Sequence, residues 1–306
     1  MSPDARILIL GANGQLGVEL QRTFAGYSNV IAMGRDRCDL ADLDQVRHVM
    51  VDARPEIVLN AAAYTAVDRA ESEQELALRV NGEAPGVLAE ESRKISALLV
   101  HYSTDYIFDG SKTSAWVEDD VPAPLSIYGS SKLAGERSIQ AAGGKYLIFR
   151  TSWVFSPHGH NFLRTMLRLG AEREQLKIVN DQTGAPTSAS AIASATRGVL
   201  DRLFSDGVSE SAAWPGIYHM TCAGQTTWCG FAEAIFQRAL NPQERAWAKV
   251  TGIPGVEYPT PAVRPANSVL SNEKLQAKFG VRLVPWEAAL DETLQTLGLA
   301  QNSVSR

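Results

Sequence analysis

Residues 6–20 read RILILGANGQLGVEL, and this stretch decides the fold. The apolar run 6–10 predicts a buried strand, and residues 15–24 place leucines and a phenylalanine on one stripe of a helix. Three glycines occupy the junction between them: Gly11, Gly14 and Gly17. Glycines here allow a tight turn, a close approach of pyrophosphate to the backbone and close packing of helix on strand. The alternative is a plain glycine turn, but the strand-to-helix position favours a dinucleotide-binding loop.

Strand and helix patterns alternate beyond this loop. Further strands are predicted at 29–33, 56–60, 96–103 and 145–150, and helices at 42–53, 71–93 and 126–142. This alternation predicts βαβ units and an α/β fold of the Rossmann type, a doubly wound parallel sheet. The strands are apolar throughout, as expected where helices cover both faces of a sheet.

The pattern changes after about residue 155. Residues 241–268 are rich in proline and short of periodicity. We therefore expect an NAD(P)-binding Rossmann domain over 1–155 and mainly a smaller substrate-binding lobe over 156–306. Within that lobe, residues 187–222 are expected to return to the Rossmann core.

Composition limits the classes of function. The chain has 306 residues, 45% hydrophobic and 21% charged, with a net charge of −5. An acidic protein without a basic face is not expected to bind nucleic acid. We also expect no membrane span, because no apolar run reaches the roughly 18 residues that one needs. The three cysteines form no C-x-x-C pair and no secretory leader is visible, which together predict a cytoplasmic protein.

The end of the second predicted strand favours one dinucleotide. An acidic residue there would bind the ribose 2′-hydroxyl of NADH, whereas arginine accommodates the 2′-phosphate of NADPH. Gly34 occupies that position, and Arg35 and Arg37 follow it. NADPH is therefore the expected cofactor, with NADH left open by the nearby Asp36.

A catalytic group is predicted at the ends of two elements. Tyr128 and Lys132 lie four residues apart in LSIYGSSKLAGE (125–136), so a helix would place them on one face. Ser103 and Thr104 end a predicted strand, where ligands of parallel sheets bind. Each feature has a plainer interpretation, a solvated helix face or a simple strand end. Together with the glycine loop they indicate one site.

This group suits the reduction of a carbonyl. Hydride goes from a nicotinamide to carbon, and a proton must go to oxygen. Tyrosine ionises near pH ~10, and a nearby ammonium and an oxidised nicotinamide would both lower that pKa. We therefore expect Tyr128 to be the acid, Lys132 to tune it and to bind ribose hydroxyls, and Thr104 to position the substrate oxygen.

These motifs match the extended short-chain dehydrogenases/reductases. Longer strings resemble the dTDP-4-dehydrorhamnose reductases of that family nearly from end to end: GANGQLG, NAAAYTAVDRAES, HYSTDYIFDG, YGSSKLAGE, FRTSWVF, NDQTGAPT and YPTPAVRPANSVL. The resemblance implies NAD(P)H-dependent reduction of the 4-keto group of dTDP-4-dehydro-L-rhamnose to dTDP-L-rhamnose, the last step of dTDP-rhamnose biosynthesis. The related dehydratases carry Thr-Asp-Glu, whereas this chain has Tyr106 in place of the glutamate, which favours reduction.

The resemblance also implies roles for particular residues. Cofactor contacts fall on Gly11, Asn13, Gly14, Gln15, Leu16, Gly17, Asp39, Leu40, Ala62, Ala63, Tyr64, Thr65, Tyr128 and Lys132. Substrate contacts fall on Thr104, Asp105, Trp153, Asn161 and Arg264. A stacking aromatic suits a sugar ring, and a guanidinium suits a diphosphate.

Two other functions stay open at this stage. One is a non-catalytic, cofactor-binding regulatory subunit, the role that one relative has with a methyl-donor synthetase, and the other is a 4-keto reductase for a different dTDP-deoxysugar. His158 and His160 lack partners at ligand spacing, so no metal is expected, and His101 is expected to be a packed core histidine. Some relatives join a dimer through a carboxylate-held metal. Ser190 replaces one such carboxylate here, so a homodimer is compatible with the sequence but that metal is not expected.

Overall fold

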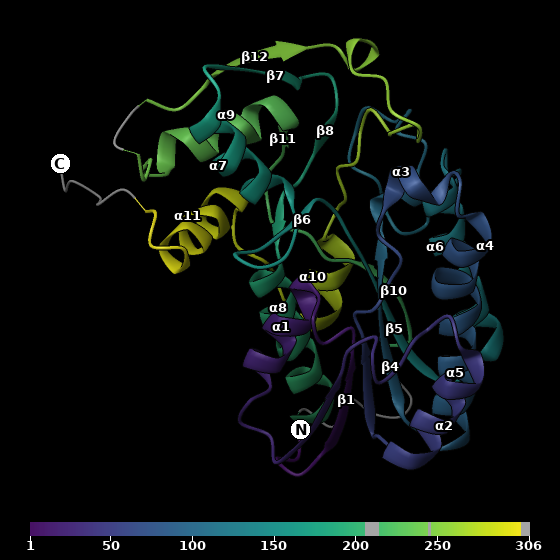
Figure 1. Cartoon of the computed structure of the whole chain (residues 1–306). Helices are drawn as coiled ribbons and strands as arrows, with labels where there is room; N and C mark the ends of the chain where they lie inside the picture. The colour runs from purple at the N-terminus through teal and green to yellow at the C-terminus, as the bar shows by residue number, and fades with distance from the viewer. Residues whose placement is uncertain (206–213, 244–245, 301–306) are drawn as a thin grey trace.

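A six-stranded parallel sheet forms the centre of the computed structural model, which describes residues 1–205, 214–243 and 246–300 (Figure 1). Its strands lie in the order β10-β5-β4-β3-β1-β2. Their bounds are β1 Arg6–Leu10, β2 Asn29–Met33, β3 Ile57–Asn60, β4 Leu98–Thr104, β5 Lys145–Thr151 and β10 Gly216–His219. All five pairings are parallel, and the predicted α/β fold of the Rossmann type is confirmed.

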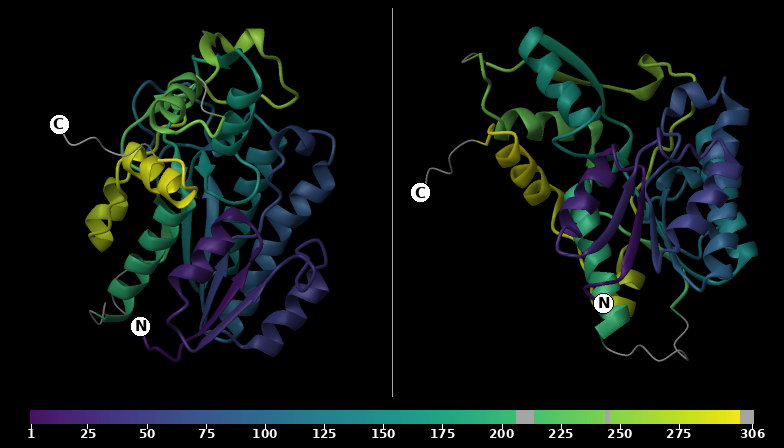
Figure 2. Two further views of the ribbon diagram at one scale, coloured as in Figure 1. Left: turned by 60° about the vertical axis from the view of Figure 1, so that its left-hand side comes forward. Right: turned by 60° about the horizontal axis from the view of Figure 1, so that its bottom comes forward.

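Helices cover both faces of this sheet (Figures 1 and 2). One layer holds α1 (Gln15–Thr23) and α8 (Ala189–Ser205), and the other holds α2 (Leu43–Ala53), α5 (Ala84–Lys94) and α6 (Ile127–Ala142). Alternate residues of each strand pack against the two helix layers, because successive side chains of a strand point to opposite faces. In β1, Ile7 and Ile9 join the core under the first layer, and Leu8 and Leu10 join the core under the second.

The helix predicted over 71–93 is broken by a π-helical turn. The segment consists of α4 (Gln74–Leu78), the turn Arg79–Glu83 and α5. Pro85 has no N–H, so the carbonyl of Asn81 loses the donor that an α-helix would give it. This loss explains why the hydrogen-bond pattern changes from α-helical to π-helical here. Gly135 of α6 packs against the freed carbonyl: an added Cβ would come within 2.1 Å of the Asn81 oxygen.

The remaining elements lie beyond the carboxyl ends of the strands, except α10, which packs against α8 and β10 (Figure 1). They are α7 Phe162–Glu172, β7 Gln175–Val179, α9 Trp228–Arg238, β12 Lys249–Ile253, α10 Glu273–Phe279 and α11 Trp286–Thr296. Two short pairs connect them to the sheet, β6 (Val154–Phe155) with β9 (Thr187–Ser188) and β8 (Thr183–Gly184) with β11 (Thr226–Thr227). The strand β12, which pairs with β7, lies inside the stretch that is short of periodicity in the sequence, and it was not predicted.

Three short turns complete the chain: α3 (Val67–Ala70) and the 3₁₀ turns Asp105–Ile107 and Gly255–Glu257. Between β9 and β10 the chain runs back along the sheet, with α8 against α1 and β10 beside β5. In the part of the chain that the structure describes, no helix is long and apolar enough to cross a membrane.

Candidate active site

A cavity of about 610 Å³ lies at the carboxyl ends of the sheet strands. Most residues predicted to bind the cofactor line it: Gly11, Asn13, Gly14, Gln15, Leu16, Arg35, Asp39, Leu40, Ala62, Ala63, Tyr64, Thr65, Tyr128 and Lys132. Gly17 lies behind this lining, and an added Cβ would come within 2.0 Å of the Gly11 carbonyl oxygen. The cavity also takes in residues that the sequence did not suggest, among them Gly159 and His160 from beyond the sheet.

The glycine loop leaves its backbone open to a ligand. Gly11 has φ +77°, and an added Cβ there would lie 2.6 Å from the backbone nitrogen of Ala62. Gly14 precedes α1 and supplies no side chain to cap the free N–H groups of that helix. A dinucleotide pyrophosphate fits such a terminus, because it accepts from the free N–H groups and lies at the positive end of the helix dipole.

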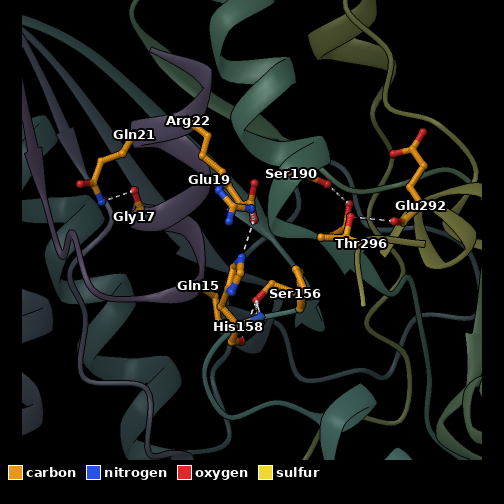
Figure 3. A network of polar contacts seen from close by, with 12 residues as sticks. Gln15, Gly17, Glu19, Gln21, Arg22, Ser156, His158, Ser190, Glu292 and Thr296 are labelled. Carbon is orange, nitrogen blue, oxygen red and sulfur yellow. Dashed lines mark hydrogen bonds and ion pairs between the residues drawn. The ribbon is translucent and has the colours of Figure 1, made fainter. Parts of the chain in front are cut away.

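The first residue of α1 is held by the loop that follows β6 (Figure 3). The Gln15 side-chain oxygen accepts from the Ser156 hydroxyl at 3.1 Å and from Asn161 Nδ2 at 2.8 Å. His158 faces Glu19 one turn further along α1, with 3.5 Å between Nε2 and Oε1. Asn161 also caps α7, so its side chain is committed to the protein, and it does not line the cavity.

Tyr128 and Thr104 meet beneath the cavity. The Tyr128 hydroxyl has a hydrogen bond with Thr104, whose own hydroxyl donates to Asp105 Oδ1 at 2.9 Å. Burial raises the pKa of Tyr128 to about 12, and the bond with Thr104 only partly opposes this. We expected a neighbouring ammonium to favour the phenolate, but in the cofactor-free protein desolvation dominates.

Lys132 is turned toward the strands beneath it. Its Nζ donates to the Tyr102 carbonyl at 2.7 Å and lies 3.1 Å from His101 Nε2. Burial lowers the pKa of Lys132 to about 8, with the Glu136 carboxylate opposing the shift. The lysine therefore lies on the tyrosine's helix face, as predicted, but its hydrogen bonds are with residues of β4.

Sequence reasoning missed a set of buried polar residues behind this pair. Asn81 of the π-helical turn accepts from the Tyr64 N–H at 2.8 Å, and its Nδ2 donates to the Tyr64 carbonyl and to Ser131 Oγ. It therefore joins a cavity-lining loop to the helix that carries the tyrosine. His101, expected to be mere packing, contacts both Lys132 and Asn60. A polar residue inside an apolar strand was the available signal, because buried polar groups need partners.

The residues predicted to bind substrate lie around the cavity but do not line it. Asp105 is fully buried, and burial raises its pKa to about 6 despite hydrogen bonds from Ser268 and Thr104. Trp153 has φ +47° and stacks on Trp228 with 3.5 Å between ring centroids. Arg264 is paired with Asp68 at 2.8 Å.

Two positions were considered for a metal in the sequence, the pair His158 and His160 and the position of Ser190. In the described ranges, no group of three or more His, Cys, Asp or Glu side chains is placed to hold a metal ion. Ser190 contacts the Ser188 hydroxyl at 3.1 Å.

The whole chain is similar to proteins of one enzyme family. The family model described as the RmlD substrate binding domain matches residues 5–299. A dTDP-4-dehydrorhamnose reductase of Burkholderia thailandensis is 49% identical over 288 residues, covering 93% of this chain and 96% of the relative. The corresponding protein of Escherichia coli K12 is 42% identical over 297 residues, covering 95% and 97%.

Solved structures agree with these sequence relatives. The dTDP-4-dehydrorhamnose reductase of Bacillus anthracis, solved in complex with NADP, superposes with a TM-score of 0.87 at 33% identity and covers 96% of this chain and 99% of that one. A UDP-glucose 4-epimerase of Thermus thermophilus shares the fold at 22% identity, with a TM-score of 0.77. Given its sequence relatives, its fold and the Tyr128–Lys132 site, the chain belongs to the family of the dTDP-4-dehydrorhamnose reductases.

Proposed function

We propose that this protein reduces the 4-keto group of dTDP-4-dehydro-L-rhamnose to give dTDP-L-rhamnose, with NADPH as the cofactor. The observation that carries the proposal is the junction of Tyr128 and Thr104 beside a glycine loop at one cavity. Bound NADPH supplies the hydride for the 4-keto carbon. The residues of this chain have to bind the cofactor and the sugar, orient the carbonyl group and protonate its oxygen.

In this proposal Tyr128 gives its proton to the carbonyl oxygen as hydride reaches the carbon. The high pKa of the buried phenol keeps that proton in place near neutral pH. Thr104, already bonded to Tyr128, positions the same oxygen. Lys132 binds the ribose hydroxyls of the nicotinamide half, and the free N–H groups after Gly14 bind the pyrophosphate.

We assign the binding of NADPH and the binding of the dTDP-sugar to different parts of the chain. Residues 1–155 together with 187–222 would hold NADPH, and the rest of the C-terminal half would hold the dTDP-sugar. Asp105 and Trp153 would contact the sugar ring, and Arg264 the nucleotide end. Asn161, whose side chain is committed to Gln15 and to the cap of α7, would instead hold the loop that precedes α7. A homodimer and a cytoplasmic location stay predictions from the sequence.

The deciding experiment is NADPH oxidation by the purified protein with a panel of dTDP-4-keto sugars. The highest kcat/KM is expected with dTDP-4-dehydro-L-rhamnose, and the product should be identified by NMR. A higher value for an isomeric keto sugar would assign the enzyme to another deoxysugar. No turnover with any member, together with a stoichiometric enzyme partner in a pull-down, would instead support the regulatory subunit.

A further inference from the structure

A fully buried histidine lies directly behind the proposed cofactor lysine. His101 of β4 stands opposite Asn60 of β3 in the strand register, and both side chains are at most 1% exposed. The His101 ring has a polar neighbour at each nitrogen. Nδ1 lies 3.1 Å from Asn60 Nδ2, and Nε2 lies 3.1 Å from Lys132 Nζ.

The direction of donation along this chain of contacts can be worked out. Asn60 Oδ1 accepts from the Ala62 N–H at 3.2 Å, which fixes the amide with its nitrogen toward His101. An amide nitrogen only donates, so His101 Nδ1 must accept and a neutral ring then carries its proton on Nε2. The opposite amide orientation would set the NH₂ group against the Ala62 N–H and leave that donor without a partner.

This tautomer constrains the charge of Lys132. The Nε2–H of His101 needs an acceptor, and an ammonium has none, whereas a neutral amine has one lone pair. A neutral Lys132 satisfies every contact, because it accepts from His101 and still donates to the Tyr102 carbonyl at 2.7 Å. Burial works in the same direction, since it lowers the pKa of both Lys132 and His101.

We infer that Asn60 and His101 form a positioning pair that holds Lys132 as a neutral amine in mildly alkaline solution until the cofactor binds, so that NADPH binding is coupled there to uptake of a proton by Lys132. The proton comes from solvent and converts the amine to an ammonium; no other bond changes. The ammonium can no longer accept from His101, and its N–H groups become available to the ribose hydroxyls. The coupling rests on the proposed function, whereas the tautomer and the neutral amine belong to the cofactor-free protein.

Two other titratable groups near Lys132, Glu136 and Tyr128, lie on the same helix and have partners of their own. Glu136, on α6 with Lys132, favours the ammonium, but it is bonded to Arg150 of β5 at 2.8 Å and accepts from Ser103 at 2.5 Å. Tyr128, also on α6, is neutral because burial raises its pKa, and its charged neighbour is Asp105. Because the carboxylate of Glu136 is already paired with Arg150, it opposes the effect of burial on Lys132 only in part.

The first test reads the tautomer without any cofactor. The chain has five histidines, so ¹⁵N-histidine labelling gives few signals, and His101→Gln identifies those of His101. We expect His101 to show a protonated Nε2 and an unprotonated Nδ1 at about pH 9, above the lowered pKa of Lys132. A protonated Nδ1 would overturn the inference, whatever the protein does with substrate.

The second test measures proton uptake by calorimetry of NADPH binding in buffers of different ionisation enthalpy. At about pH 9, above the lowered pKa of Lys132, the wild type should take up close to one proton per NADPH bound. Asn60→Asp should reduce this uptake severalfold. Its carboxylate still accepts from the Ala62 N–H, but it also accepts from Nδ1–H, which turns Nε2 into an acceptor for a permanent ammonium.

His219→Gln is the matched control. His219 is an equally buried histidine at the end of the next strand but one, and Lys132 has its hydrogen bonds with His101 and Tyr102 instead. The control should keep the wild-type uptake. No uptake in the wild type, or equal uptake in Asn60→Asp, would overturn the coupling. Failure of the proposed function looks different: NADPH would bind with proton uptake, but no keto sugar would be reduced.

Discussion

At the scale of single residues, Tyr128 is a phenol kept protonated by its surroundings. Burial raises its pKa to about 12, so near neutral pH the phenol is protonated and can act as an acid. Tyr128→Phe should therefore lower kcat by about 10²-fold or more, the range for a lost general acid. NADPH affinity, measured by fluorescence titration, should change by less than about twofold. Wild-type turnover in this variant would rule out the mechanism.

Asp105 is a residue whose burial opposes folding at neutral pH. Burial raises its pKa from 3.8 to about 6, so the folded protein holds this proton more tightly than the unfolded chain. Its contribution to stability is therefore greatest below about pH 4 and declines until about pH 6. Asp105→Asn should raise the free energy of unfolding by about 1–3 kcal/mol at pH 7 and change it little near pH 4.

Urea denaturation at the two pH values measures this difference. Asp109→Asn is a suitable control, because Asp109 lies in an exposed turn where its carboxylate accepts from the N–H and hydroxyl of Ser111. The asparagine keeps an oxygen that can accept both bonds but lacks the negative charge, so the control should be destabilised only slightly. An equal effect of Asp105→Asn at both pH values would show that the carboxyl is not strained by burial.

Single residues also show where sequence reasoning ends. Motif spacing predicted Tyr128 and Lys132 on one helix face, because helical periodicity is a local property. The contact of His101 with Asn60 depends on how two strands align across about forty intervening residues. No local sequence pattern predicts how these two strands align, so the sequence analysis expected His101 to be only a packed core residue.

At the scale of elements, the turn after β2 places Arg35 and Arg37 in different surroundings, although the sequence analysis gave both the same expected role. Arg35 lines the cavity with a side chain 76% exposed, and its ion-pair partner is Asp39 at 3.2 Å. Arg37 is absent from the lining and points toward the Ala32 carbonyl at 3.4 Å. Of the two, Arg35 is therefore the one placed to reach a 2′-phosphate.

We expect Arg35→Ala to reduce the preference for NADPH over NADH by about tenfold or more, the effect of one lost charge-assisted hydrogen bond. Arg37→Ala should change it by less than about twofold. The measurement is kcat/KM for both cofactors in wild type and each variant. Equal effects of the two substitutions would mean that the cofactor approaches the turn from another side.

Elements differed in how well their sequence predicted them. The sheet strands and the helices with a clear apolar stripe were found within a few residues, because burial imposes their periodicity. The π-helical turn at 79–83 and the strand β12 were missed. The first depends on Pro85 and on packing against Gly135, and the second on pairing with β7, neither of which leaves a periodic trace.

At the scale of the whole molecule, an ion pair joins the α3 segment to the C-terminal half. Arg264 donates to Asp68 at 2.8 Å, and the Ala262 N–H donates to the same carboxylate. A diphosphate at Arg264 would compete with Asp68 for the guanidinium. Arg264→Ala should raise KM for the dTDP-sugar by roughly 10- to 150-fold.

Asp68→Asn removes the competing charge and should lower that KM by a few fold. Both variants should leave the NADPH dissociation constant unchanged, since neither residue lines the cofactor cavity. Steady-state kinetics with varied sugar at saturating NADPH tests both. If Arg264→Ala keeps KM within about twofold of wild type, the diphosphate is bound elsewhere.

The return of the chain at β10 has a consequence for biosynthesis. The outer edge of β5 is covered only after β10 has paired with it, with Ile217 opposite Ile148. During synthesis on the ribosome this edge therefore stays unpaired until most of the chain has been made. An open strand edge is a template for pairing with other chains. Nascent chains stalled at residue 205 should therefore be captured by trigger factor-like chaperones and cut readily by protease, whereas chains that include β10 should resist both. Equal protease resistance at the two lengths would show that the sheet is stable with that edge open.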